Sequence, residues 1–253
     1  NDRRTVYALD GGAVVAVDVV TGRVGEPIVL QVEATVIAAN RDGRSAFVIC
    51  PTGAEQIDLA ERTRLRFGYE GRPSAIAASY KHDQMFVATH DGIDLVYLGT
   101  SGHHGRGGQV AYTIPLGAPP GAMAMNGSGT RIYAVARGTG VVVVVDTEQL
   151  VVVDRIRLGV EATALAVDAR ESRLYAGTAD GVVLLDLPSK EILRRVPLPG
   201  RAMDIAVSPN ADEVYVALGG ARLGIAVLSA TDLAIERVID LDAAPARILV
   251  ATY

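Results

Sequence analysis

Two charged residues, Asp204 and Arg247, interrupt short apolar segments whose pattern recurs along the 253-residue chain. Their segments are "MDIAVS" and "ARILVA", and the corresponding position of the other copies is apolar, at Val36, Ala75, Ala122 and Ala164. A carboxylate and a guanidinium in neighbouring repeats could anchor an anionic or hydroxylated ligand, with Arg201 nearby. They could instead pair with each other and fix the closing repeat, because buried charges are normally paired. We favour the ion pair, and the ligand anchor stays open.

Acid–base chemistry would need a titratable side chain close to a second polar group, and the stretch "HDG" offers His90 beside Asp91. A lyase could use His90 with Asp91 or Asp10, but the same stretch is typical of an ordinary turn. The chain has no G-x-S-x-G, H-E-x-x-H or P-loop motif. A calcium centre would need several converging oxygen ligands, whereas Asp204 is the only acid at its repeat position. We therefore expect no catalytic residue, with His90 the one weak candidate, and no cofactor or metal.

One repeat, between residues 73 and 119, is irregular and holds all the histidines. His103 and His104 are adjacent in "LGTSGHHGRGGQ", where imidazoles could bind a transition metal, although a solvated loop is the simpler interpretation. The segment "QVAYTIP" that follows carries no charge, and an uncharged strand edge can accept another chain. Tyr112, Tyr97 and the two adjacent histidines are therefore candidates for protein docking, unless the loop itself covers the edge.

The composition argues against several classes of protein. The net charge is −5, and the 24 Lys and Arg residues are scattered rather than gathered in the basic stripe typical of nucleic-acid binders. The valine-rich stretch 138–156 is interrupted by Asp146, Glu148 and Asp154, and no apolar run approaches the ~20 residues of a membrane-spanning helix. Cys50 is the only cysteine, so no disulfide can form within the chain. We expect neither nucleic-acid binding nor membrane insertion, and a monomer.

An aromatic residue marks each of six repeats, in segments such as "RIYAV" and "EVYVA". The aromatics are Tyr7, Phe47, Phe86, Tyr133, Tyr175 and Tyr215, with spacings of 40, 39, 47, 42 and 40 residues. An alanine-rich segment precedes each aromatic except the first, an apolar segment that often ends in Asp follows, and a charged segment completes the unit. Each unit is thus predicted to form four short strands separated by turns.

Four strands in about 40–45 residues are the period of a β-propeller blade. The alanine-rich strand would line the crowded axis, the apolar strand would lie between neighbouring blades, and the charged strand would protect the outer edge. The chain begins in a second-strand pattern and finishes in a first-strand pattern, so the last strand is expected to close the ring on the N-terminal blade. We predict an all-β fold, a six-bladed β-propeller in one domain. The expected blades are 4–33 with 245–252, 34–72, 73–119, 120–161, 162–201 and 202–244.

Propellers usually bind ligands on the face formed by the loops between second and third strands and by the loops between blades. Charged residues fall in both kinds of loop. Those of the first kind hold Asp10, His90, Asp91, Arg137, Asp180 and Arg222, and those of the second kind hold Glu33, Glu70, Arg72, Glu161, Arg201 and Asp242. The candidate ligand-binding residues are Asp204, Arg247, Arg137, Arg201 and Arg222.

The segments "NGSGTRIYAVARGTGVVVVVDTEQLVVVDRIRLG" and "SPNADEVYVALGGARLGIAVLSATDLAIERVIDL" resemble the YVTN-type repeats of bacterial and archaeal β-propellers. The likeness covers nearly the whole chain, with departures at Tyr97 and Ser229, where the pattern has Asp. The resemblance implies a propeller fold and a bacterial protein. Relatives of this group are often extracytoplasmic or surface-layer binding proteins, and some lactonases and lyases share the architecture.

Together these observations favour a non-catalytic binding or scaffold module. It would engage a protein or small ligand at the channel mouth or at the irregular third blade. A small-molecule lactonase or lyase acting at the channel mouth is the alternative, and the sensor domain of a larger receptor or kinase is a third. The resemblance points to an extracytoplasmic location.

Overall fold

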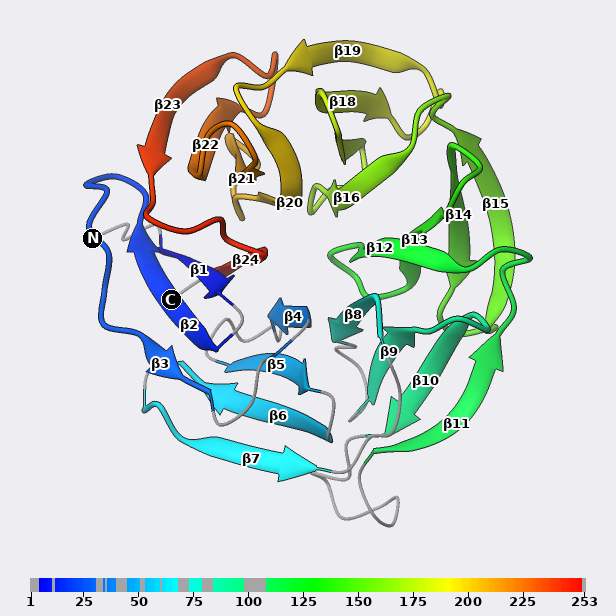
Figure 1. Cartoon of the computed structure of the whole chain (residues 1–253). Helices are drawn as coiled ribbons and strands as arrows, with labels where there is room; N and C mark the ends of the chain where they lie inside the picture. The colour runs from blue at the N-terminus through cyan, green and yellow to red at the C-terminus, as the bar shows by residue number, and fades with distance from the viewer. Residues whose placement is uncertain are drawn as a thin grey trace.

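Six four-stranded antiparallel sheets stand around a central channel in the computed structural model, so the protein is a six-bladed β-propeller (Figure 1). The prediction of an all-β, six-bladed fold is confirmed. The structure describes residues 5–10, 12–30, 34, 36–39, 45–50, 53–59, 61–67, 73–78, 84–97 and 108–251.

Within each sheet one strand lines the channel and the fourth lies at the rim. From channel to rim, blade 1 contains β24 (Arg247–Ala251), β1 (Thr5–Asp10), β2 (Ala13–Asp18) and β3 (Ile28–Val29). In the same direction, blade 2 contains β4 (Val36–Ala39), β5 (Ser45–Cys50), β6 (Gly53–Asp58) and β7 (Arg64–Phe67). Blade 3 contains β8 (Ala75–Ala78), β9 (Gln84–Ala88), β10 (Ile93–Tyr97) and β11 (Gln109–Ile114).

The remaining three blades have the same strand order. Blade 4 contains β12 (Pro120–Met125), β13 (Arg131–Ala136), β14 (Val141–Asp146) and β15 (Val151–Arg157). Blade 5 contains β16 (Ala162–Val167), β17 (Arg173–Thr178), β18 (Gly181–Asp186) and β19 (Ile192–Pro197). Blade 6 contains β20 (Arg201–Val207), β21 (Glu213–Gly219), β22 (Gly224–Ser229) and β23 (Ile235–Asp240).

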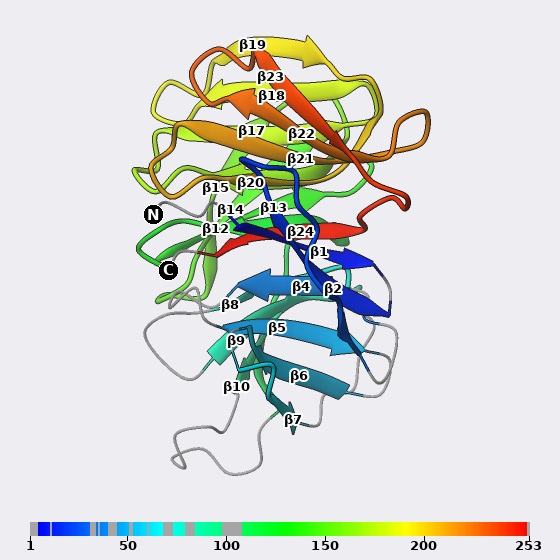
Figure 2. The ribbon, with the colours of Figure 1, turned by 90° about the vertical axis from the view of Figure 1, so that its left-hand side faces the viewer.

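The ring closes through blade 1, which combines the last described strand with the first three. β24 pairs antiparallel with β1, in a register that sets Arg247 opposite Leu9 and Ala251 opposite Thr5. Figure 2 shows the red β24 beside the blue β1. The expected closure by the C-terminal strand is therefore confirmed.

The valine run occupies β14, the third strand of blade 4, and its side chains serve two blade interfaces. Val142 and Val144 pack in the cluster shared with blade 5, whereas Val143 and Val145 pack in the cluster shared with blade 3. Successive side chains of a strand point to opposite faces, so a strand covered on both faces needs a continuous apolar run.

The recurring aromatics all lie on second strands and are at most 5% exposed. Tyr133 and Tyr175 direct their hydroxyls to the following blade, where they donate to Glu171 Oε1 at 2.5 Å and to the carbonyl of Ala230 at 2.9 Å. Burial, and then the hydrogen bond to Glu171, raise the pKa of Tyr133 far above its usual value. The aromatic repeat thus fills the core and also links neighbouring blades.

Arginines of the outer strands form a second set of links. Arg155 and Arg195 each donate to a carbonyl of the preceding blade, of Leu116 and Leu158 respectively, and both distances are 2.9 Å. The sequence suggested only that these charges protect the rim. The structure shows that they also satisfy carbonyls at the end of the neighbouring outer strand, which is the usual requirement for backbone groups away from water.

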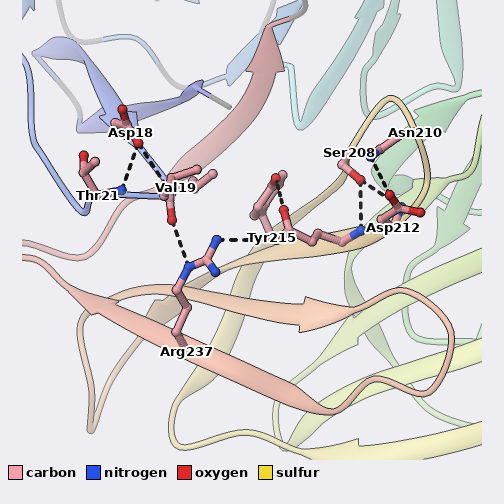
Figure 3. A network of polar contacts seen from close by, with 10 residues as sticks. Asp18, Val19, Thr21, Ser208, Asn210, Asp212, Tyr215 and Arg237 are labelled. Atoms are coloured by element: carbon pink, nitrogen blue, oxygen red, sulfur yellow. Dashed lines mark hydrogen bonds and ion pairs between the residues drawn. The ribbon is translucent and has the colours of Figure 1, made fainter. Parts of the chain in front are cut away.

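Blades 6 and 1 are joined by a polar network that we call the ring latch, formed by Glu213, Tyr215, Arg237 and the carbonyl of Val19 (Figure 3). Arg237 Nε donates to the Val19 carbonyl at 2.8 Å, and its Nη2 lies 3.4 Å from Glu213 Oε1. The Tyr215 hydroxyl donates to Glu213 Oε2 at 2.6 Å. The Glu213 side chain is only 8% exposed, so the latch places a carboxylate inside the interface that closes the ring.

Candidate functional site

The inner strand of each blade is hydrogen-bonded to a neighbour on one side only, so its other edge faces the channel. Free edge groups need partners when they are shielded from water. Polar side chains on or beside the inner strands supply some of them. Ser74 Oγ donates to the carbonyl of Pro120 at 2.9 Å, and Thr163 Oγ1 donates to that of Ala202 at 2.7 Å.

Asp204 has the same role from β20. Its Oδ2 accepts a hydrogen bond from the backbone N–H of Ile248 at 2.9 Å, which ties blade 6 to the closing strand of blade 1. Asp204 is half-buried and lines a cavity of the channel. Burial raises the pKa of Asp204, and nearby Arg247 and backbone N–H groups offset only part of that rise.

Arg247 lies across the channel. Its Nη1 donates to the carbonyl of Met203 in blade 6, and its Nη2 donates to the carbonyl of Ser74 beside blade 3, both at 3.2 Å. In the described structure Arg247 and Asp204 form no ion pair within 4.0 Å. The ion pair that the sequence favoured is therefore not formed. Instead, Asp204 and Arg247 each form hydrogen bonds with backbone groups of other blades.

The raised pKa of Asp204 leads to a prediction for stability against pH. The folded protein holds this proton to a higher pH than the unfolded chain, whose aspartates titrate near ~3.9. The protonation of Asp204 therefore contributes fully to the free energy of unfolding below that pH. This contribution is lost as the pH rises through the pKa of Asp204 in the folded protein. An amide oxygen can still accept from Ile248, so Asp204→Asn should melt at a higher temperature than wild type at pH 7.

Melting curves at several pH values would check this, and the advantage of Asp204→Asn should shrink as the pH falls toward ~4. A variant that melts lower than wild type at pH 7, with an unchanged pH slope, would show that the ionised carboxylate stabilises the fold.

A cavity of about 320 Å³, which we call the mouth pocket, lies at the loop face of the channel. Three of the predicted arginines line it: Arg137 after β13, Arg201 at the start of β20, and Arg247. The other lining residues are Ser74, Gly121, Ala122, Glu161, Ala162, Thr163, Ala202 and Met203. Arg137 and Arg201 are exposed, and neither guanidinium has a hydrogen bond or ion pair to any described residue. The structure thus brings together two unpartnered cations and a third that is held by carbonyls.

Among the described residues that line the mouth pocket, Glu161 is the one acid. Both its carboxylate oxygens accept from the backbone N–H of Gly138, at 3.1 and 3.0 Å. Gly138 has a φ of +73°, a conformation that suits glycine. Across the described lining, Glu161 has no ion pair with an arginine within 4.0 Å.

A second cavity of about 240 Å³, the inner chamber, lies on the other side of Arg247. Its wall extends from Asp204 and Arg247 to Met125, Val207 and Val250 near the far ends of the inner strands. Arg247 and Ala122 line both cavities, so these two residues mark the boundary between them.

The structure does not bring every predicted residue to this site. Arg222 is half-buried and donates to Asp240 from Nε at 2.7 Å and from Nη2 at 3.1 Å, and it does not line the mouth pocket. His90 is exposed in the β9–β10 loop and does not line the mouth pocket either.

The docking candidates lie on blade 3. Tyr112 is 48% exposed on the rim strand β11, and Tyr97 is half-buried on β10. His82, His103 and His104 lie outside the described residues. Docking at this rim remains a prediction.

The described residues form no metal site and no membrane-spanning helix. They contain no group of three or more His, Cys, Asp or Glu side chains placed to hold a metal ion. No helix within them is long and apolar enough to cross a membrane.

The sequence did not indicate the roles of Ser74 and Thr163, whose hydroxyls link inner strands near the mouth pocket. The available signal was a hydroxyl residue just before the alanines in "PSAIAA" and "ATALAV". That signal is weak, because Ser and Thr are equally common in turns.

Comparison with known proteins supports the fold. No protein-family model matches the chain. It is 30% identical over 145 residues to the seven-bladed beta-propeller protein Rv1057 of Mycobacterium tuberculosis, an alignment that covers 54% of this chain and 37% of that protein. It thus spans well under two thirds of that relative's length. Among solved structures, a chain of Kuenenia stuttgartiensis hydrazine synthase superposes with a TM-score of 0.64 at 15% identity, covering 87% of this chain and 90% of the other. Similarity at that identity shows a shared propeller fold alone.

Proposed function

We propose that this protein is a non-catalytic binding propeller whose mouth pocket takes a small anionic ligand. The observation that carries the proposal is the placement of Arg137 and Arg201, both without a partner among the described residues, beside Arg247 in one cavity. Unpartnered guanidinium groups converging on a cavity present planar, paired donors, the geometry that suits carboxylate and phosphate groups.

The size of the mouth pocket indicates the size of the ligand. Its volume of about 320 Å³ lies at the lower end of the ~300–1,000 Å³ typical of small-molecule sites. A ligand with one or two acid groups and a short carbon chain fits this volume. The surface of a partner protein would contact only the rim of the pocket.

The hydroxyl groups of the pocket favour binding over catalysis. Ser74 and Thr163 already donate their hydrogens to backbone carbonyls, and among the lining residues described no imidazole stands beside them as a base. His90, the residue on which a lyase would depend, lies outside the pocket. A lactonase or lyase is therefore the less supported alternative.

Isothermal titration of the purified protein with inorganic phosphate and short dicarboxylates would test the proposal. Each charge-assisted hydrogen bond is worth ~1.5–3 kcal/mol, so Arg137→Ala or Arg201→Ala should each weaken binding about tenfold or more. The affinity should also fall with added salt.

Arg222→Ala is the matched control, because Arg222 occupies the equivalent loop of blade 6 but already pairs with Asp240. It should bind as wild type does. If no anion binds, or if Arg222→Ala weakens binding as much as the pocket variants do, the proposed function is wrong.

A further inference from the structure

The mouth pocket contains a feature that simple anion binding does not require. A carboxylate in an anion site repels the ligand, yet Glu161 lines the same cavity as Arg137, Arg201 and Arg247. The position of this acid therefore needs an explanation in terms of what the ligand carries.

Glu161 is held in place by the backbone. Both its oxygens accept from one N–H, that of Gly138, at 3.1 and 3.0 Å. An ionised carboxylate offers about four acceptor positions, so most of this capacity is still available to a ligand. The Glu161 carboxylate is thus held in place and can still accept hydrogen bonds from a ligand.

The opposite charges of the pocket are kept apart. Within the described part of the chain, no arginine of the mouth pocket comes within 4.0 Å of the Glu161 carboxylate to form an ion pair, although all of them face one cavity of about 320 Å³. A ligand that carries an acid group and a nearby donor could contact the arginines and Glu161 together. A plain anion would satisfy the arginines and meet repulsion from Glu161.

We infer that the mouth pocket selects small acids that carry a hydrogen-bond donor, an ammonium or a hydroxyl, next to the acid group, and that Glu161 is the residue that recognises this donor. The inference rests on the proposed anion-binding function and names the class of ligand for that site.

Succinate, malate and aspartate form a matched series for the test, because they share four carbons and two carboxylates and differ in carrying no donor, a hydroxyl or an ammonium. Titration of the wild-type protein should give affinities for malate and aspartate at least about fivefold above that for succinate. Tighter binding of aspartate than of malate would assign an ammonium, and the reverse order a hydroxyl.

Glu161→Gln tests the recognising residue, because its amide oxygen can still accept from Gly138 while the charge is removed. In this variant succinate should bind more tightly than to wild type and aspartate more weakly, so that the fivefold difference disappears.

Equal affinities for the three acids in wild type would overturn the inference, and so would Glu161→Gln binding all three more tightly by the same factor. Failure of all three to bind while phosphate still binds through Arg137 and Arg201 would also overturn it, yet leave the proposed function intact. If the wild-type protein binds none of the anions, the proposed function itself is wrong.

Discussion

Replacing Gly224 by alanine should destabilise the propeller by about 3 kcal/mol or more, a large part of the ~5–15 kcal/mol that typically keeps a domain folded. Gly224 begins β22 with a φ of +151°, and a Cβ at this position would lie 2.1 Å from the carbonyl oxygen of Ile239. That oxygen belongs to the backbone of the adjacent rim strand, so no side-chain rotation can relieve the clash. Chemical denaturation followed by circular dichroism would measure the loss.

The same close approach recurs at the start of two other third strands. A Cβ on Gly181 would lie 2.0 Å from the carbonyl oxygen of Val196, and one on Gly92 would lie 2.2 Å from that of Ile114. Gly12 provides the control, because a Cβ there would meet no atom within 4 Å. Gly12→Ala should change the free energy of unfolding by less than ~1 kcal/mol. Equal stability of Gly224→Ala and Gly12→Ala would show that the rim strand can shift at little cost.

Replacing Glu213 by alanine should open the ring latch and lower the free energy of unfolding by about 2–3 kcal/mol. The variant removes the acceptor of the Tyr215 hydroxyl and the partner of the Arg237 guanidinium at the interface of blades 6 and 1. Removing one member of a fully buried pair costs ~3–5 kcal/mol, but Arg237 is 37% exposed and water can reach it, so we expect a loss at or below the lower end of that range. Thermal and denaturant unfolding would both report the loss.

Asp240→Ala is the matched control within the same blade. It breaks the Arg222–Asp240 ion pair, whose side chains are 41% and 67% exposed, and such exposed pairs contribute little. Glu213→Ala should therefore have a clearly lower free energy of unfolding than Asp240→Ala. A Glu213→Ala protein as stable as Asp240→Ala would show that the latch is not needed to hold the ring closed.

The strands of the propeller could be predicted because each blade repeats one local pattern. Tyr133 and Tyr175 mark second strands, and Val142–Val145 mark a strand buried on both faces, without knowledge of the neighbouring blades. Part of the site could also be predicted, since the repeat places Arg137 and Arg201 in loops of the same face.

The remaining contacts depend on how the ring closes, which local patterns do not contain. Arg247 reaches the carbonyl of Ser74, 173 positions earlier in the chain, because both flank one channel. Arg222 looked equivalent to Arg137, but its side chain turns to Asp240. Glu213 stands in "NADEVYVA", where an acid before a strand is typical of an exposed turn. In the folded protein its side chain is buried and pairs with Arg237, which itself reaches the carbonyl of Val19 in blade 1.

Pairing of β24 with β1 also determines the order in which the protein can mature during synthesis. Blades 2 to 6 are each built from strands that follow one another in the chain, so their hairpins can form locally as the chain emerges. Blade 1 is different, because β1 contacts residues 247–251. Its inner edge must wait for the last strand of the ring, and until then it offers free backbone groups to any other extended segment. The first strands of the ring to be made are thus the last to reach their final neighbours, and during this interval nascent chains are most exposed to pairing with one another.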